Sequence, residues 1–386
     1  MTRHRQLYQE YPEPGEEVVA QQLADYSRDV VVARKNFLSG TTDRDVHGKG
    51  IAALKAELIV DLGLPPEFRH GVFAHGGRRF PCWIRLSNGN QHPGKDSKPD
   101  VRGFAIKLMG VEGEKLLPEE RWATTQDFLL FSGPIFFTAT TEQFFDLIKS
   151  FNTNLLAILW FGLRNPRVLL ATLRLFKRYG NLLEVKYWST TPYRLGEIAV
   201  KYVIEPRSKE RSAVPWRPAR NYLRDRAAET LAKTDVLYDF FVQVQKDPYR
   251  QPIENALVEW KESQAPLQKV ATIRIPRQPV DTPERNQVAE NLAMNIFHCL
   301  PEHRPLGNVN RSRGLVYRTI ADFRRRRNLV PAVEPTAGPD FFADPDADSG
   351  LADTSAQPLG WDTPAERGQL ERRQTTDRRS GPGGAG

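Results

Sequence analysis

Residues 80–87 (FPCWIRLS) and residues 102–109 (RGFAIKLM) contain the clearest structural pattern in this sequence. Both are short stretches of aromatic and branched apolar residues, and a connection rich in Gly, Asn, Pro and Asp joins them. Stretches of this kind between turn-forming residues predict β-strands.

The rest of the chain adds further strands and several helices. Stretches of similar composition predict strands at residues 127–131, 199–204, 255–260 and 270–275. Apolar residues at helical spacing, or a charged helical pattern, predict helices at residues 16–32, 141–151, 166–179, 221–233 and 309–327. Strands with long connections are typical of an antiparallel sheet that closes into a barrel. The sequence therefore predicts an α+β fold, an antiparallel β-barrel with flanking helices.

Charge and composition divide the 386 residues into three parts. Residues 1–40 are polar and predict an N-terminal arm or helix, residues 41–333 hold the folded domain, and residues 334–386 form a tail. The tail is rich in Pro, Gly, Asp, Ser and Arg, and we expect it to be disordered. It contains ten acidic residues and five arginines, so the net charge of +8 conceals a body of +13. A basic body is compatible with a nucleic acid, an anionic membrane or an anionic cofactor as partner.

The cysteine count and the N-terminus concern the cellular compartment. Two cysteines, Cys82 and Cys299, cannot form a disulfide framework, which indicates a reducing compartment. Residues 1–6 (MTRHRQ) lack the apolar segment of a secretory signal. We expect a soluble protein of the cytoplasm; the sequence gives no indication of its oligomeric state.

The longest apolar stretch lies at residues 155–163 (LLAILWFGL) and is too short to span a bilayer. Residues 155–177 together form an apolar and basic helical region that could lie on an anionic membrane surface. Packing against the barrel is the more common role of such a region, and we expect packing here.

Arg313 and Tyr317 are four residues apart on the helix predicted at 309–327, so their side chains meet on one face. Arg324 returns to the same face, because eleven residues are close to three turns. A free tyrosine has a pKa near 10, so a phenolate needs a metal and a nearby cation. The pattern therefore suggests an iron-binding Tyr317 supported by Arg313. The alternative is a solvated basic helix end, since residues 324–327 are four arginines.

His47 lies in the segment Arg44-Asp45-Val46-His47-Gly48-Lys49-Gly50. At a peroxide site, a histidine can take a proton from the peroxide and return it to the departing oxygen. Its other ring nitrogen then needs a partner that fixes the tautomer. A single histidine is more often structural. Zinc binding by His298, Cys299 and His303, or by His70, His75 and Cys82, is a weaker alternative, because neither group has paired Cys-x-x-Cys spacing.

Several segments in addition match, in order, the pattern of a known family. They are Arg44 with Val46 and His47, residues 84–87 (IRLS), residues 100–107 (DVRGFAIK), residues 134–137 (PIFF) with Phe144, and Arg313 with Tyr317 and Arg324. Over roughly residues 40–330 the sequence resembles the haem catalase family, as a divergent and minimal branch. The resemblance implies a catalase-like barrel of about eight strands, haem b (iron protoporphyrin IX) as cofactor, and hydrogen peroxide or an organic hydroperoxide as substrate.

The resemblance also implies a role for each matching residue. His47 is the acid and base, Ser87 holds it, and Tyr317 ligates the iron with support from Arg313. The other residues are implied to surround the cofactor: Arg44, Arg85 and Arg324 at the propionates, Val46 over the haem, Gly103 and Phe131 beside it, and Phe136 and Phe144 along the distal channel.

One departure concerns Phe131. The family has an asparagine three residues before the proline that corresponds to Pro134, and this chain has Phe131 there. The exchange removes a hydrogen-bond donor and makes the pocket drier. We therefore expect weak catalase turnover and room for a lipid or organic hydroperoxide. Residues 300–307 (LPEHRPLG) also differ from ordinary catalases.

Two other functions remain open at this stage. One is conversion of a fatty-acid hydroperoxide, as in the catalase-related allene oxide synthases and hydroperoxide lyases, although those tend to have a threonine where this chain has Val46. The other is a haem-binding or nucleic-acid-binding protein without turnover. The basic residues are dispersed and form no nucleic-acid motif, so we expect no nucleic-acid partner.

Overall fold

The computed structural model describes residues 5–33, 42–343 and 361–362. Within these residues, eight antiparallel strands close into a barrel in the order β5-β4-β3-β2-β1-β9-β8-β7, and pairing of β5 with β7 completes the circle. A further strand, β6, pairs with β7. The strands are β1 (Gly50–Val60), β2 (Arg79–Asn88), β3 (Arg102–Met109), β4 (Thr125–Phe131), β5 (Tyr187–Trp188), β6 (Tyr193–Leu195), β7 (Ile198–Pro206), β8 (Val236–Val244) and β9 (Leu267–Ile275).

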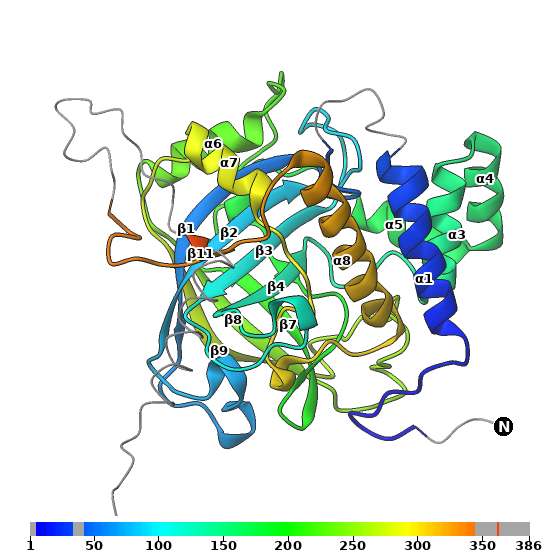
Figure 1. Ribbon diagram of the computed structural model, residues 1–386, viewed down its shortest axis with the longest axis horizontal. Coiled ribbons are helices and arrows are strands. Elements are labelled where there is room, and N and C mark those ends of the chain that lie inside the picture. Colours follow the sequence, from blue (N-terminus) through cyan, green and yellow to red (C-terminus); the bar gives the residue numbers. More distant parts are fainter. Residues whose placement is uncertain (1–4, 34–41, 344–360, 363–386) are drawn as a thin grey trace, which may run out of the picture.

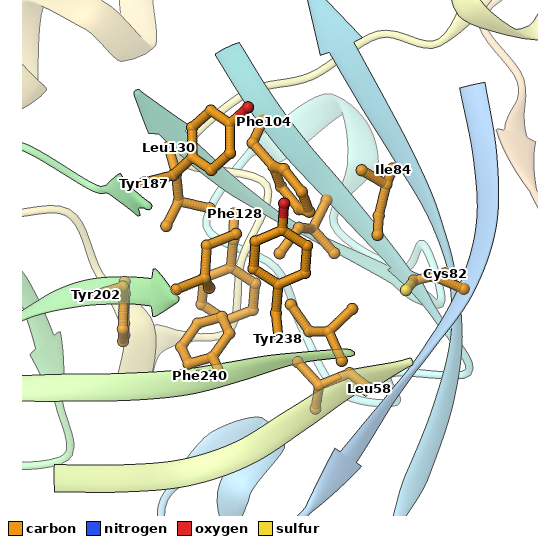
Figure 2. Packing of buried hydrophobic residues seen from close by; sticks show 14 of the residues in the cluster. Leu58, Cys82, Ile84, Phe104, Phe128, Leu130, Tyr187, Tyr202, Tyr238 and Phe240 are labelled. Atoms are coloured by element: carbon orange, nitrogen blue, oxygen red, sulfur yellow. The ribbon is translucent and has the colours of Figure 1, made fainter. Parts of the chain in front are cut away.

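Aromatic and aliphatic side chains fill the inside of the barrel (Figure 2). Phe104 contacts Tyr187 with their ring centroids 5.0 Å apart, and Phe128 contacts Phe240 at 5.4 Å. Such aromatic pairs add about 0.5–1.5 kcal/mol each beyond the burial of their area. Because side chains occupy the interior, a ligand as large as a cofactor has to bind outside the barrel wall.

Strand alternation decides which residues face outward. On β3, Phe104, Ile106 and Leu108 point into the core, so Gly103, Ala105 and Lys107 lie on the outer face. Their partners across the ladders share that face: Ser87 and Arg85 on β2, and Phe131, Leu129 and Asp127 on β4. The outer face of β2, β3 and β4 thus carries four of the residues that the resemblance identifies: Arg85, Ser87, Gly103 and Phe131.

Helices surround the barrel on its outside (Figure 1). Figure 1 shows α8 along the barrel wall, α6 and α7 at another side, and α1 with α3, α4 and α5 gathered beyond α8. The α-helices are α1 (Glu16–Tyr26), α3 (Thr141–Phe151), α4 (Leu155–Arg164), α5 (Pro166–Leu175), α6 (Tyr222–Leu231), α7 (Pro283–Asn291) and α8 (Asn308–Asn328). A π-helical segment, η1 (Ser27–Val32), continues α1, and short 3-10 turns are η2 (Pro66–Phe68), η3 (Gly71–Phe73), η4 (Pro118–Glu120), η5 (Leu182–Glu184) and η6 (Pro301–His303).

The predicted α+β barrel is confirmed, with differences in single elements. The strand predicted at residues 255–260 is wrong: this segment is a loop in which the Asn255 side chain accepts a hydrogen bond from the Leu257 N–H at 3.1 Å. The predictions omit β1, whose sequence GIAALKAELIV has a helix-like composition and is buried on both faces. They also omit β8 and α7, although the β8 sequence VLYDFFVQV is typical of a strand.

The structure differs from two predictions about the outer parts of the chain. The helical region after residue 155 does not pack on the barrel as a whole, because α4 has no buried residue. The tail expected from residue 334 begins with residues that belong to the folded unit, since Glu334 forms an ion pair with the buried Lys107 and β10 (Glu334–Pro335) pairs with β11 (Trp361–Asp362). The other expected tail residues, 344–360 and 363–386, and residues 34–41 lie outside the described residues.

None of the described helices is by itself long and apolar enough to cross a membrane; α4 and α5 reach that length and composition only as a pair bent by 109°.

Candidate functional site

A cleft lies between the outer face of β2, β3 and β4, the helix α8 and the loop that precedes β1. It encloses about 910 Å³ of space free of protein atoms, part of which is open to solvent. Nine of the twelve predicted site residues line it, namely Arg44, Val46, His47, Arg85, Ser87, Gly103, Phe131, Tyr317 and Arg324.

Helix α8 forms one wall of the cleft. Tyr317, Ile320, Ala321 and Arg324 line the space because helical spacing places them on one face. Arg313 is one turn earlier and lies behind this wall, where its Nε and Nη2 donate to the Tyr317 hydroxyl oxygen at 3.2 and 3.1 Å. The tyrosine oxygen therefore has a buried guanidinium beside it.

His47 lies on the opposite wall, in the loop before β1. Its φ of 56° places it in the left-handed region, which few residues other than glycine adopt and which turns the loop sharply. Its N–H donates to the Gly89 carbonyl at 3.1 Å, and nearby Lys49 pairs with the buried Asp96 at 2.6 Å. The His47 Nδ1 is 2.9 Å from the Ser87 hydroxyl oxygen. The two backbone and ion-pair contacts fix the loop, and the contact with Ser87 fixes the orientation of the imidazole ring.

Gly103 allows His47 and Ser87 to approach each other. It is the ladder partner of Ser87, and a Cβ at this position would lie 2.6 Å from the Ser87 Oγ and 2.7 Å from the His47 Nδ1. Real Cβ atoms essentially never come so close to other heavy atoms. The histidine–serine pair thus requires a residue without a side chain at 103.

His47 is neutral over the physiological range. Burial, together with the positive charges of Arg85 and Arg313 and then of Arg44 and Arg102, lowers the pKa of His47 from 6.5 to about 3. A neutral imidazole with one nitrogen hydrogen-bonded to a hydroxyl can accept a proton on its other nitrogen.

Three arginines, Arg44, Arg85 and Arg324, lie together at the cleft, and we call them the arginine trio. Arg85 donates to the backbone carbonyls of Ala289 and His47 at 2.7 and 3.0 Å. Glu290 pairs with the other two, at 3.4 Å from Arg44 and 2.5 Å from Arg324.

Burial nevertheless lowers the pKa of all three arginines, that of Arg85 to about 10, and repulsion from neighbouring arginines adds to this effect. The neighbouring carboxylates do not compensate for the loss of hydration. An anionic ligand in the cleft would therefore stabilise the charges of the trio.

A second ionic group occupies the same outer face four residues along β3, and we call it the Lys107 cluster. Lys107, with a side chain only 1% exposed, lies 2.8 Å from Asp127 and 2.6 Å from Glu334. Thr125 donates to Glu334 at 2.7 Å and contacts the His298 Nε2 at 2.6 Å, while the His298 Nδ1 lies 2.7 Å from Glu120. Burial opposes the charge of Lys107, but the carboxylates outweigh it and raise the pKa of Lys107.

Phe131 replaces the hydrogen-bonding residue that the resemblance implies. Its ring stacks on the His47 ring with centroids 5.1 Å apart and an interplanar angle of 29°. Phe136 packs on Phe131 at 6.3 Å, and Phe144 packs on Phe136 at 5.3 Å.

Phe136 and Phe144 therefore form a layer behind the cleft wall. They do not line the cleft itself, although the resemblance implies that they lie along the distal channel. The physical reason is the size of the Phe131 ring, which lies between them and the space. Arg313 also does not line the cleft, because it stands behind Tyr317.

Some cleft residues are absent from the predictions. Ile320 and Ala321 follow from the spacing of Tyr317 and Arg324 on α8, so the helical pattern could have identified them. Ala293 and Met294 line the cleft from the segment after α7, and no pattern in the sequence indicates them.

The alternative zinc sites do not form within the described residues, where no group of three or more His, Cys, Asp and Glu side chains is placed to hold a metal ion. His303 is part of the core: its Nε2 accepts from the Val72 N–H at 3.0 Å and its Nδ1 contacts the Tyr202 hydroxyl at 2.8 Å.

Comparison with known proteins shows the fold of this chain. No family model matches the sequence, and no curated protein matches it. Among solved structures, the chain is similar to a fungal catalase, with a TM-score of 0.61 and 17% identity over 84% of this chain and 66% of that one. It is also similar to a bacterial catalase, with a TM-score of 0.61 and 17% identity over 91% of this chain and 69% of that one. The fold is catalase-like, and the chain spans about two thirds of the length of these proteins.

Proposed function

We propose that the cleft binds haem b and that the protein turns over peroxides. The observation that carries the proposal is the composition of this cleft: a tyrosine supported by a buried arginine on one wall and a neutral histidine held by a serine on the other. The catalase-like fold is consistent with it, and the similar structures are catalases.

The chemistry of the lining residues fits a haem group. Apolar side chains such as Val46, Val316 and Ile320 suit the faces of a porphyrin, and the arginine trio supplies buried guanidinium groups that can pair with two propionates. When bound, haem supplies a ferric iron that a phenolate can ligate and that supports peroxide cleavage. Tyr317 would ligate this iron, and Arg44, Arg85 and Arg324 would hold the propionates.

In this proposal, Arg313 holds the Tyr317 oxygen in position as the ligand of the iron. Its two donors at 3.1 and 3.2 Å stabilise a phenolate more than a neutral phenol. Thr191 and Asn310 each accept from the Arg313 Nη1 at 3.1 Å and hold the guanidinium in place.

His47 moves the proton of the substrate. With its Nδ1–H donated to the Ser87 oxygen, its Nε2 accepts the proton of the hydroperoxide and returns it to the departing oxygen, which leaves as water or as an alcohol. Because the pKa of His47 is lowered to about 3, the ring is in the basic form before the substrate arrives.

Phe131 favours an organic hydroperoxide over hydrogen peroxide. Its ring offers no hydrogen bond where it stacks on His47, and it excludes water from that wall. Hydrogen peroxide, which is small and polar, loses a partner there, whereas an alkyl hydroperoxide gains an apolar contact. Conversion of an organic hydroperoxide is therefore the form of the activity that Phe131 supports.

The test compares two substrates on one haem-loaded preparation. With a phenolic electron donor in excess, which supplies the two electrons that reduction of a hydroperoxide to its alcohol requires, we expect consumption of cumene hydroperoxide to exceed oxygen evolution from hydrogen peroxide, and Phe131→Asn to shift the ratio toward hydrogen peroxide. Leu129→Met, a volume-conserving change on the same strand and cleft wall, is the matched control and should leave the ratio unchanged. Absence of turnover of both substrates by the haem-loaded protein would contradict the proposal.

A further inference from the structure

The helices α4 and α5 form an exposed apolar hairpin beyond α8 as seen from the barrel (Figure 1). On α4, five large apolar side chains are 58–75% exposed: Leu155, Leu156, Leu159, Trp160 and Leu163. Soluble proteins rarely expose so many large apolar residues together, and such a surface marks an interaction site.

α5 continues the exposed surface although it is anchored to the domain. Val168, Ala171 and Leu175 are buried at helical spacing, and Ala171 and Leu175 pack with Val101 and Ile135. The opposite side of the helix exposes Leu169, Leu170 and Leu173 by 47–67%. Since the inner side alone fixes the helix to the domain, the outer leucines serve another contact.

The charge around the hairpin is of one sign. Residues 147–183 contain six basic residues and no acidic residue. Arg174 pairs with Glu259 and Lys149 with Asp146. Within the part of the chain that the structure describes, Arg164, Arg167, Lys177 and Arg178 are exposed and form no ion pair. The hairpin surface therefore combines exposed leucines with cations that form no ion pair, and such a surface suits an anionic partner.

Trp160 and Arg164 are arranged as in a helix that lies at a membrane interface. The Arg164 guanidinium lies over the Trp160 ring, 4.8 Å from its centroid, at the exposed side of α4. Tryptophan and arginine are enriched where proteins meet lipid headgroups, since each has an apolar part and a polar end. Each helix has ten residues, about 15 Å in length, so neither can span a bilayer, and both would lie in its surface.

We propose that the α4–α5 hairpin docks this protein on an anionic phospholipid bilayer, with its leucines and Trp160 in the acyl boundary and its arginines and lysines at the headgroups. A second copy of the chain fits the hairpin less well. In a twofold contact the same patch meets itself, so the unpaired cations of both copies would face each other without a carboxylate between them.

The base of the hairpin is in contact with the wall of the cleft. Phe176, which follows α5, lies 6.2 Å from Phe137 by ring centroids, and Phe137 lies 6.4 Å from Phe131. Phe131 lines the cleft. A docked protein thus has a continuous row of aromatic rings from the lipid-facing helices to the site. Resting on the proposed function, this arrangement indicates hydroperoxides of membrane acyl chains as the substrate class.

The experiment measures co-flotation of the full-length protein with vesicles, either of phosphatidylcholine alone or of phosphatidylcholine mixed with phosphatidylglycerol. We expect binding to the anionic vesicles and little to the neutral ones. Arg164→Gln with Arg167→Gln should lower the partition coefficient about fivefold per cation, and Leu156→Glu with Leu159→Glu should abolish binding. Matched controls are Lys209→Gln with Lys233→Gln for the charges and Leu62→Glu for an exposed leucine elsewhere, and these should bind as wild type.

Equal reductions in the control variants, or no binding of wild type to anionic vesicles, would overturn the proposal. A concentration-dependent dimer in solution that Leu156→Glu with Leu159→Glu dissociates would assign the patch to a second copy and would also overturn it. Flotation does not depend on haem or turnover. A protein that binds anionic vesicles but takes up no haem would therefore refute the proposed function and leave the docking intact.

Discussion

The arginine trio and the Lys107 cluster lie on the same outer face of β2, β3 and β4 and differ in how their charges are balanced. At the Lys107 cluster, three carboxylates hold one buried lysine firmly charged. At the trio, burial lowers the pKa of each arginine in spite of Glu290, and repulsion from neighbouring arginines adds to this effect. A buried cation that carboxylates of the protein already pair needs no ligand, whereas buried cations with a lowered pKa are typical of a binding site.

The comparison separates two kinds of substitution. Changes at the Lys107 cluster should affect the free energy of unfolding without a direct effect on the ligand. Changes at the cleft should affect ligand binding or turnover and leave folding nearly intact. Four substitutions or conditions test this separation.

The largest effect is expected for His47→Ala, which removes the base from the cleft. We expect turnover of a hydroperoxide per bound haem to fall by about 10²–10⁴-fold, while haem binding and the thermal midpoint change little. His75→Ala, at an exposed histidine, is the matched control and should be fully active. Activity of His47→Ala within a factor of about two of wild type would remove His47 from the reaction.

Lys107→Met should lower the free energy of unfolding by about 3–5 kcal/mol, because it leaves Asp127 and Glu334 buried without their cation. Lys186→Met breaks a more exposed pair with Glu205 and should cost at most about 1 kcal/mol. Urea denaturation of the apoprotein measures both. If the two variants lost equal stability, the Lys107 cluster would not contribute more to the stability of the fold than an exposed ion pair does.

Arg324→Gln should weaken haem binding with little effect on the apoprotein. Loss of one charge-assisted hydrogen bond to a propionate corresponds to about 1.5–3 kcal/mol, or roughly 10–150-fold in the dissociation constant. Arg326→Gln, on the exposed side of the same helix, is the control. A haem titration by absorbance decides: equal affinities of the two variants would mean that the trio does not hold the propionates.

The smallest effect concerns pH. Since the pKa of His47 is about 3 in the fold and 6.5 without it, turnover should show no inflection between about pH 8 and pH 5, where an unperturbed histidine titrates. The unfolded state binds more protons below pH 6.5, so His47 makes the protein less stable as the pH falls from 6.5 toward 3.

His47→Asn should reduce this acid sensitivity in part, because His303, whose pKa is also lowered to about 3 by burial, contributes in the same direction. Acid denaturation followed by circular dichroism compares wild type with this variant. Identical pH dependence of their stability would show that His47 is not held neutral by the fold.

Local patterns predicted part of the site. Helical spacing on α8 predicts that Arg313 and Tyr317 meet, whereas the roles of Ser87 and Gly103 are implied only by the resemblance. The left-handed conformation of His47 and the stacking of Phe131 on its ring depend on contacts between distant segments, so no local pattern contains them.

Non-local effects also account for the differences in the fold. Glu334 completes the Lys107 cluster from a segment whose composition predicts disorder. An apolar ten-residue helix such as α4 is usually buried, and its exposure follows from how α3 and α5 hold it away from the barrel.

Ligation of haem iron by Tyr317 can be tested by the absorption spectrum of the ferric protein after addition of haem, with Tyr317→Phe beside wild type. We expect a Soret band and the charge-transfer bands of a five-coordinate, tyrosinate-ligated ferric haem in wild type and their loss in Tyr317→Phe. Identical spectra of the two proteins, or a wild-type protein that takes up no haem, would contradict it.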